Sequence, residues 1–378
     1  MQRSYVLKSK QLLMICLGIF FIVAPTETAM KTEQYYYVLC GVLAVLCWFG
    51  KGLKVRADYS LTLVFYLLYS YLTCIWTPNT NISRYVLVKT IAILFLFITI
   101  QFEYSEDQYR KIKLLLIIQQ FVLLGMFIFY GRIDWDGRLW IGSGGISTDP
   151  NSYTMWTIIP LCFLIEKITE KDVKILRKII YIVCMLATIY VVMMSGSRSG
   201  IIINIVAGAL SLLFRFKDDL RRNPSRSIWL LLLIIVLAFV VYTNIPEVTL
   251  RRFAASDTRQ LGGRTTTWST FLSKLNEHPW GYLVGLGEYS TVYYSKSGAV
   301  AHSVIIEILF SQGLIGLSLV LFLLYKAFRN IWIRDKYAGI GYMCTAVMSA
   351  TLSEFTSRPV MTMLFLGSML VVTEDNNT

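Results

Sequence analysis

Three basic side chains stand where chemistry could occur in a largely apolar chain. Arg198 lies in the small-residue turn 194–200, Arg264 follows two glycines, and His302 precedes an apolar block and is one of only 2 histidines. A guanidinium group can bind a phosphate through two parallel hydrogen bonds. An imidazole can take and return a proton near neutral pH. Together these residue types could bind an anion beside a group that takes and returns a proton.

Each of the three residues also has a structural interpretation. Arg198 could hold a hairpin against lipid headgroups, Arg264 could be a solvated loop residue, and His302 could cap a helix or lie at an interface. His278 precedes a proline and fits the end of a helix. Three further arginines fit solvated or headgroup-facing positions: Arg251, Arg252 and Arg259.

Other polar residues point to no metal or cofactor. Asp149-Pro150-Asn151 precedes an apolar block, where Asp149 suits a turn and a helix cap. The glycines at 281, 285 and 287 follow no strand, which argues against a dinucleotide site. The spacing of His, Cys and carboxylate residues suits no metal site. The 7 cysteines lie in or beside apolar blocks and fit buried hydrophobic positions.

The composition places these residues in a membrane. Of the 378 residues 56% are hydrophobic and 16% are charged, against about 25% charged in soluble domains. The apolar residues fall into blocks of roughly 16–22 residues, long enough to span a bilayer as helices. This pattern excludes a soluble enzyme, a disordered chain and a disulfide-stapled secreted domain. It favours an all-α polytopic membrane protein over a β-barrel.

Twelve blocks predict about twelve transmembrane helices in a single integral membrane domain, 1–378. Lys89 lies inside the fourth block. The blocks are 11–25, 35–50, 59–76, 85–101, 113–130, 151–166, 179–194, 199–214, 228–244, 303–325, 337–353 and 359–373.

The basic residues predict the orientation. Of the 36 Lys and Arg residues, we count 23 in loops on the side of the two termini and 12 on the other side. Because Lys and Arg accumulate in short cytoplasmic loops, both termini are expected in the cytoplasm. One long extracytoplasmic loop, 245–300, then lies between spans nine and ten.

This loop contains the pattern of an amphipathic helix. Trp268, Phe271, Leu272 and Leu275 follow helical spacing with polar residues between them. We expect this helix to lie on the outer membrane face or to cap a cavity, and to end at His278-Pro279.

Five motifs in this order resemble the O-antigen ligase and Wzy-type polysaccharide polymerase superfamily, over about residues 149–330. They are Asp149-Pro150-Asn151, Gly196-Ser197-Arg198-Ser199-Gly200, Gly263-Arg264 with Trp268, His278-Pro279-Trp280-Gly281 with Gly285-Leu286-Gly287, and Ala301-His302-Ser303 with Gln312-Gly313-Leu314-Ile315-Gly316.

The resemblance implies a GT-C-like glycosyltransferase of the bacterial cytoplasmic (inner) membrane that works on its extracytoplasmic face without a metal or cofactor. It implies that Arg198 and Arg264 bind the pyrophosphate of an undecaprenyl-linked glycan and that His302 is catalytic. Asp149, Asn151 and Ser303 would support the site. Many members carry Asn at the position of Ser303, so the sequence departs from the family pattern there.

The leading functional prediction is polymerisation of lipid-linked repeat units into a surface polysaccharide, such as O-antigen, capsule or exopolysaccharide. The first alternative is a ligase that transfers a finished glycan to lipid A-core or another acceptor, and the second is a lipid-linked glycan flippase. The expected partners are the glycan donor and acceptor, the bilayer, a chain-length regulator and a flippase, with no nucleic acid.

Overall fold

The fold is described from a computed structural model. The structure describes residues 2–26, 33–49, 57–143, 146–222, 228, 232, 235, 239, 243–254, 264–295, 301–352, 355 and 357–372.

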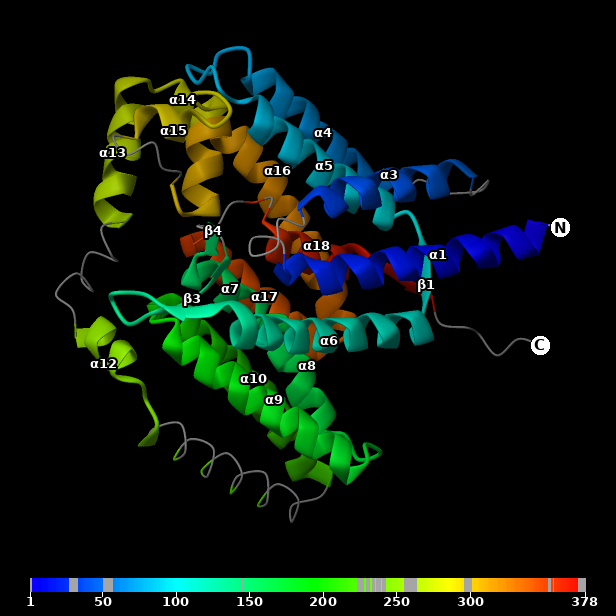
Figure 1. The fold of residues 1–378 in the computed structure, drawn as a ribbon. Helices are drawn as coiled ribbons and strands as arrows, with labels where there is room; N and C mark the ends of the chain where they lie inside the picture. Colours follow the sequence, from blue (N-terminus) through cyan, green and yellow to red (C-terminus); the bar gives the residue numbers. More distant parts are fainter. Residues whose placement is uncertain are drawn as a thin grey trace.

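Most of the described residues are helical, and the elements run through the bundle as shown in Figure 1. The helices are α1 (Gln2–Val23), the 3₁₀ helix η1 (Ala24–Thr26), α3 (Glu33–Phe49), α4 (Ala57–Thr73), α5 (Ser83–Thr99), α6 (Glu106–Tyr130), α7 (Pro150–Trp156), α8 (Ile158–Thr169), α9 (Ile175–Met194), α10 (Arg198–Arg222), α12 (Glu247–Ala254), α13 (Arg264–Glu277), α14 (Gly281–Val284), α15 (Ser290–Tyr294), α16 (Val304–Arg334), α17 (Lys336–Leu352) and α18 (Arg358–Ser368). The strands are β1 (Glu103–Ser105), β2 (Gly131–Ile133), β3 (Leu139–Ser143), β4 (Ile146–Thr148) and β5 (Leu370–Val372).

Four described helical segments are long and apolar enough to cross a membrane. They are Glu106–Tyr130, Ile175–Met194, Arg198–Lys217 and Val304–Arg334. Each coincides with a predicted block, which agrees with a helical membrane protein. The total of twelve spans and the GT-C-like arrangement stay predictions. The ninth block, 228–244, lies mostly outside the described residues.

Two predicted spans are split or end early, and a third, 303–325, is kinked at Gly313. Block 151–166 is split at Thr157, where α7 ends and α8 begins. The Thr157 hydroxyl lies 2.7 Å from the Thr154 carbonyl oxygen, and Asn204 of α10 donates to the same carbonyl at 3.0 Å. Side-chain hydrogen bonds of this kind compete with the helical ladder, so the break is stabilised by the neighbouring helix.

Block 359–373 is helical only as far as Ser368, because α16 satisfies the last carbonyl groups of α18. Arg334 donates to the carbonyls of Leu366 (2.6 Å) and Met369 (3.0 Å). The chain then continues as β5, which pairs in parallel with β1.

The interior of the bundle contains helices that are covered on all sides. Ile158–Ile165 of α8 and Pro359–Ser368 of α18 are buried without interruption. A helix that is apolar all round belongs in the centre of a bundle. Five of the cysteines are also buried, and the six described side chains are free: Cys16, Cys40, Cys74, Cys162, Cys184 and Cys344.

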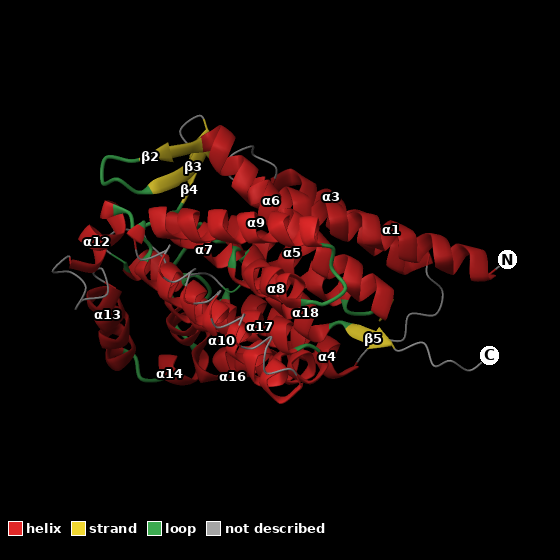
Figure 2. Cartoon of the chain, turned by 90° about the horizontal axis from the view of Figure 1, so that it is seen from below, coloured by secondary structure: helices red, strands yellow, loops and turns green. Residues whose placement is uncertain are grey.

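Loops predicted on the side of the termini meet at one end of the bundle. Lys113 of α6 contacts Asp335, between α16 and α17, at 2.8 Å and Glu166 of α8 at 2.6 Å. The start of α1 and strand β5 lie at this end in both Figure 1 and Figure 2.

The described parts of loops 131–150, 194–200 and 245–300 lie at the opposite end. Figures 1 and 2 place α12, α13 and the small sheet β2-β3-β4 there. The sheet was not predicted, and it forms because Asp136-Gly137 makes a hairpin turn in which Gly137 has φ 82°. The candidate site is built at this end.

Candidate active site

Helix α13 begins at Arg264 and is fixed by the apolar stripe that the sequence predicted. Phe271 and Leu275 are fully buried, whereas Leu272 is 37% exposed. The buried pair packs against Leu286, Ala301 and Phe310. The apolar face of α13 therefore packs against other segments of the same protein. The helix ends at Glu277, directly before His278-Pro279.

His302 lies in the short segment that enters α16. Its backbone has φ 50°, a left-handed conformation that non-glycine residues adopt uncommonly. Ala301 and Ser303 are buried on either side, while the His302 side chain is exposed. The Ser303 hydroxyl accepts from Ile306 N at 3.3 Å and donates to Ala350 O at 2.6 Å. Ser303 thus caps α16 and anchors the backbone beside His302.

Arg198 is the first residue of α10 and follows a tight turn. Gly196, in this turn, has φ 59°, and a Cβ there would lie 3.3 Å from Arg138 and 3.2 Å from Arg252. Arg198 Nη1 also donates to the Arg252 carbonyl at 3.4 Å. Glycine at this position therefore lets three arginines from separate segments pack around one turn.

The three residues singled out from the sequence lie in one electrostatic neighbourhood. Although His302 is in part exposed to solvent, its partial burial and the positive charge of Arg264 lower its pKa, while Asp149 opposes the shift. The pKa of Arg264 is lowered by burial; Asp149 opposes this shift, and Arg198 adds to it, as do Arg138 and Arg252. Residues more than 100 positions apart thus act on one another at this end of the bundle.

Two of these arginines, Arg138 and Arg252, were not singled out from the sequence as site residues. Arg138 Nε donates to the Ser195 carbonyl at 2.8 Å. Thr249 Oγ1 donates to the Met193 carbonyl at 2.6 Å, which fixes α12 and hence Arg252. Arg138 Nη2 and Arg252 Nε are buried donors without a hydrogen-bond partner among the described residues. Buried donors normally have an acceptor, so an anion bound here would supply a hydrogen-bond acceptor to both nitrogens.

Asp149 and Asn151 are placed beside this cluster by the start of α7. Asp149 accepts from Asn151 N at 2.8 Å and from Asn151 Nδ2 at 2.9 Å, and Pro150 is the first helical residue. The cap predicted for Asp149 is confirmed. Its carboxylate also acts electrostatically on Arg138, Arg264 and His302, so it partly balances the positive charge.

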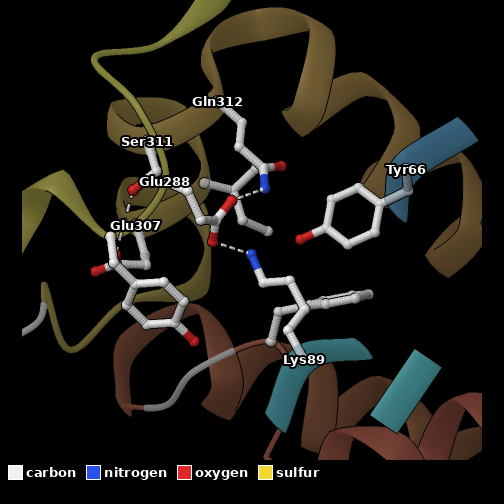
Figure 3. Close-up of a pocket in the computed structure, with 9 residues that line it drawn as sticks. Tyr66, Lys89, Glu288, Glu307, Ser311 and Gln312 are labelled. Carbon is white, nitrogen blue, oxygen red and sulfur yellow. Dashed lines mark hydrogen bonds and ion pairs between the residues drawn. The ribbon is translucent and has the colours of Figure 1, made fainter. Parts of the chain in front are cut away.

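A second polar cluster lies next to this site and surrounds the buried Lys89. Figure 3 shows Lys89 and Gln312 directed at the Glu288 carboxylate. Ser70 also donates to Glu288, at 2.7 Å. The free space has room for about one water molecule, which is too small for a sugar. The sequence placed Lys89 inside a span, but nothing in its local pattern indicated Glu288 as its partner.

The arginine cluster and His302 together offer anion binding beside a proton acceptor. Four guanidinium groups can stabilise a polyanionic leaving group, and a neutral imidazole can accept a proton. Across the described ranges, no three His, Cys, Asp or Glu side chains gather where they could hold a metal ion.

Comparison with protein families gives one match that includes most of this site. A family model described as O-antigen ligase matches residues 182–321, a segment that contains Arg198, Arg252, Arg264 and His302. The match confirms the resemblance derived from the motifs. A comparison with curated proteins gives no significant match.

Proposed function

We propose that this membrane protein is a glycosyltransferase that extends undecaprenyl-pyrophosphate-linked oligosaccharides, because residues 182–321 match the family model described as O-antigen ligase. The observation that carries the proposal is the arginine cluster beside His302. The pyrophosphate would lie among Arg138, Arg198, Arg252 and Arg264, and His302 would face the acceptor sugar. The reaction would take place on the extracytoplasmic face, with both termini in the cytoplasm.

The proposed reaction is a single displacement. The acceptor hydroxyl oxygen forms a bond to the donor anomeric carbon while the bond from that carbon to the pyrophosphate oxygen breaks. The electron pair of the broken bond leaves with the lipid pyrophosphate, where the guanidinium groups stabilise its charge. The hydroxyl proton passes to His302. Attack opposite the leaving group inverts the anomeric configuration, and no metal is required in this scheme.

His302 is suited to the role of general base. A base must be unprotonated when the substrate binds, and the lowered pKa of His302 favours the neutral imidazole. His302 is exposed and lies within electrostatic reach of Arg264, so an acceptor sugar could reach it.

A ligase is the second candidate function, because the matching family model is described as O-antigen ligase. It would use the same residues with a different acceptor, such as lipid A-core. A polymerase would need a lipid-linked unit as acceptor, supplied at the outer face by a flippase and limited in length by a regulator.

The two candidates can be separated with purified protein in nanodiscs. The polymerase proposal predicts a ladder of longer glycans when lipid-linked repeat units are the only substrate. A single product that requires a separate core acceptor would instead establish the ligase. Movement of the lipid-linked unit across a vesicle membrane without any new glycosidic bond would indicate a flippase and contradict both.

A further inference from the structure

The backbone conformation of His302 requires support from the residues around it. A non-glycine residue with φ 50° persists only where the surrounding structure holds it. Ala301 is 1% exposed and Ser303 is 2% exposed, so the support lies in buried contacts on both sides of His302.

The N–H and the carbonyl of Ala301 each form a hydrogen bond with a side chain of a neighbouring helix. Ala301 N donates to Glu307 Oε2 at 3.0 Å. Trp268 Nε1 donates to the Ala301 carbonyl at 2.9 Å. The residue directly before His302 is therefore clamped between α16, which carries Glu307, and α13, which carries Trp268.

The bond from Trp268 also connects His302 to Arg264. Arg264 and Trp268 are four residues apart in α13, and residues with this spacing lie on the same face of a helix. The Trp268 hydrogen bond therefore turns the face that carries Arg264 toward the His302 segment. This agrees with the electrostatic effect of Arg264 on His302.

Glu307 is itself held in place by two hydroxyl groups. Thr291 Oγ1 donates to Glu307 Oε1 at 2.6 Å and Ser311 Oγ donates to it at 3.3 Å, and Figure 3 shows the contact with Ser311. Glu307 lies in the first turn of α16, where a negative charge is favoured by the helix dipole. Its carboxylate is a rigid acceptor for the Ala301 N–H.

We propose that Glu307 is a positioning residue that, together with Trp268, holds the Ala301 backbone so that the His302 imidazole faces the acceptor beside Arg264. This inference rests on the proposed function of His302 as the base. Glu307 acts through the backbone and does not touch substrate.

The test measures kcat and donor KM in nanodiscs for Glu307→Ala, Glu307→Gln and Trp268→Phe. Glu307→Ala removes the acceptor for Ala301 N, so we expect kcat to fall about 10- to 100-fold with donor KM changed less than about twofold, since small misplacements of a reacting group reduce rate steeply. Glu307→Gln keeps an amide oxygen that can accept from Ala301 N and should restore most of kcat. Trp268→Phe keeps an aromatic side chain but loses the indole N–H donor to the Ala301 carbonyl, and should lower kcat as Glu307→Ala does.

Two exposed residues of the same loop serve as matched controls. Glu277 forms an exposed ion pair with Lys274, and Trp280 is 52% exposed. Glu277→Ala and Trp280→Phe should retain the kcat of the unaltered protein. If Glu307→Ala does not fold, the positioning role is tested by the other two variants: kcat should stay near normal in Glu307→Gln and fall in Trp268→Phe.

A double-mutant cycle separates positioning from general stability. In the His302→Ala background, Glu307→Ala should cause no further fall in kcat, because its effect passes through His302. Unchanged kcat in Glu307→Ala, or an additive loss in the double variant, would overturn the positioning role. Unchanged kcat in His302→Ala would instead overturn the proposed function.

Discussion

At the scale of single residues, the arginine cluster carries a repulsion that a bound anion would relieve. Arg264 interacts with the like charges of Arg198, Arg138 and Arg252, and Asp149 opposes them. Arg138 and Arg252 each also have a buried nitrogen without a hydrogen-bond partner among the described residues. A pyrophosphate would supply both the negative charge and the acceptors.

We predict that Arg138→Gln and Arg252→Gln weaken donor binding. A hydrogen bond to a charged group is worth about 1.5–3 kcal/mol, so we expect donor KM to rise roughly 10- to 100-fold, with a smaller change in kcat. Arg132 is exposed on β2, in the sheet β2-β3-β4 that Arg138 directly adjoins. Arg132→Gln is the control. Equal KM values in all three variants would remove Arg138 and Arg252 from the site.

The pH dependence of activity tests the protonation state of His302. The pKa of His302 lies below its ordinary value because of burial and Arg264, so kcat/KM should fall only when the pH drops through this lowered pKa. Asp149 raises the pKa, and Asp149→Asn removes that charge while keeping a good helix cap. We expect the acidic midpoint to move to lower pH in Asp149→Asn. A midpoint that moves to higher pH would contradict the assignment.

At the scale of elements, close approach between backbones shapes the loop before α16. The helix is kinked at Gly313, which has φ 64°, and a Cβ there would collide with the Leu283 carbonyl. Leu286 N donates to the Phe310 carbonyl at 2.8 Å beside this kink. Of the glycines at 281, 285 and 287, Gly285 lies directly against the Ser311 backbone of α16, and Gly287 lies against Thr77, which follows α4.

The ion pair between Lys89 and Glu288 ties this loop to α5, and its loss should destabilise the bundle. Lys89→Met would leave the Glu288 carboxylate buried without its cation, which typically costs about 3–5 kcal/mol. We expect a lower unfolding temperature in detergent, partly recovered in the double variant Lys89→Met, Glu288→Gln. A single variant as stable as the parent would show that the pair does not hold the loop.

At the scale of the whole molecule, local sequence patterns predicted individual helices and caps better than contacts between segments that are distant in sequence. The stripe in α13 and the Asp149 cap were predictable because each depends on residues within one or two turns. Arg198, Arg264 and His302 were predicted as site residues from their positions and motifs, and the structure brings them within electrostatic reach of one another. The places of Arg138, Arg252 and Glu288 were missed because each depends on contacts between distant segments, such as the Gly196 turn or the end of α4.

The arrangement of the two ends leads to a prediction about topology. Lys111 lies in the second turn of α6 and is exposed, and Lys274 of α13 is partly exposed. The start of α6 and helix α13 lie near opposite ends of the bundle (Figure 1). In a variant without natural cysteines, Lys274→Cys should react with an impermeant maleimide on intact spheroplasts, and Lys111→Cys only after permeabilisation. The reverse result would invert the predicted orientation.

Turnover of His302→Ala in nanodiscs, measured together with binding of the lipid-linked donor, tests whether His302 performs the chemistry beside the arginine cluster. Loss of a general base should lower kcat by about 10²- to 10⁴-fold, while the arginine cluster should still bind the donor with near-normal affinity. Chain extension at the rate of the unaltered protein would contradict the claim that His302 performs the chemistry beside these arginines.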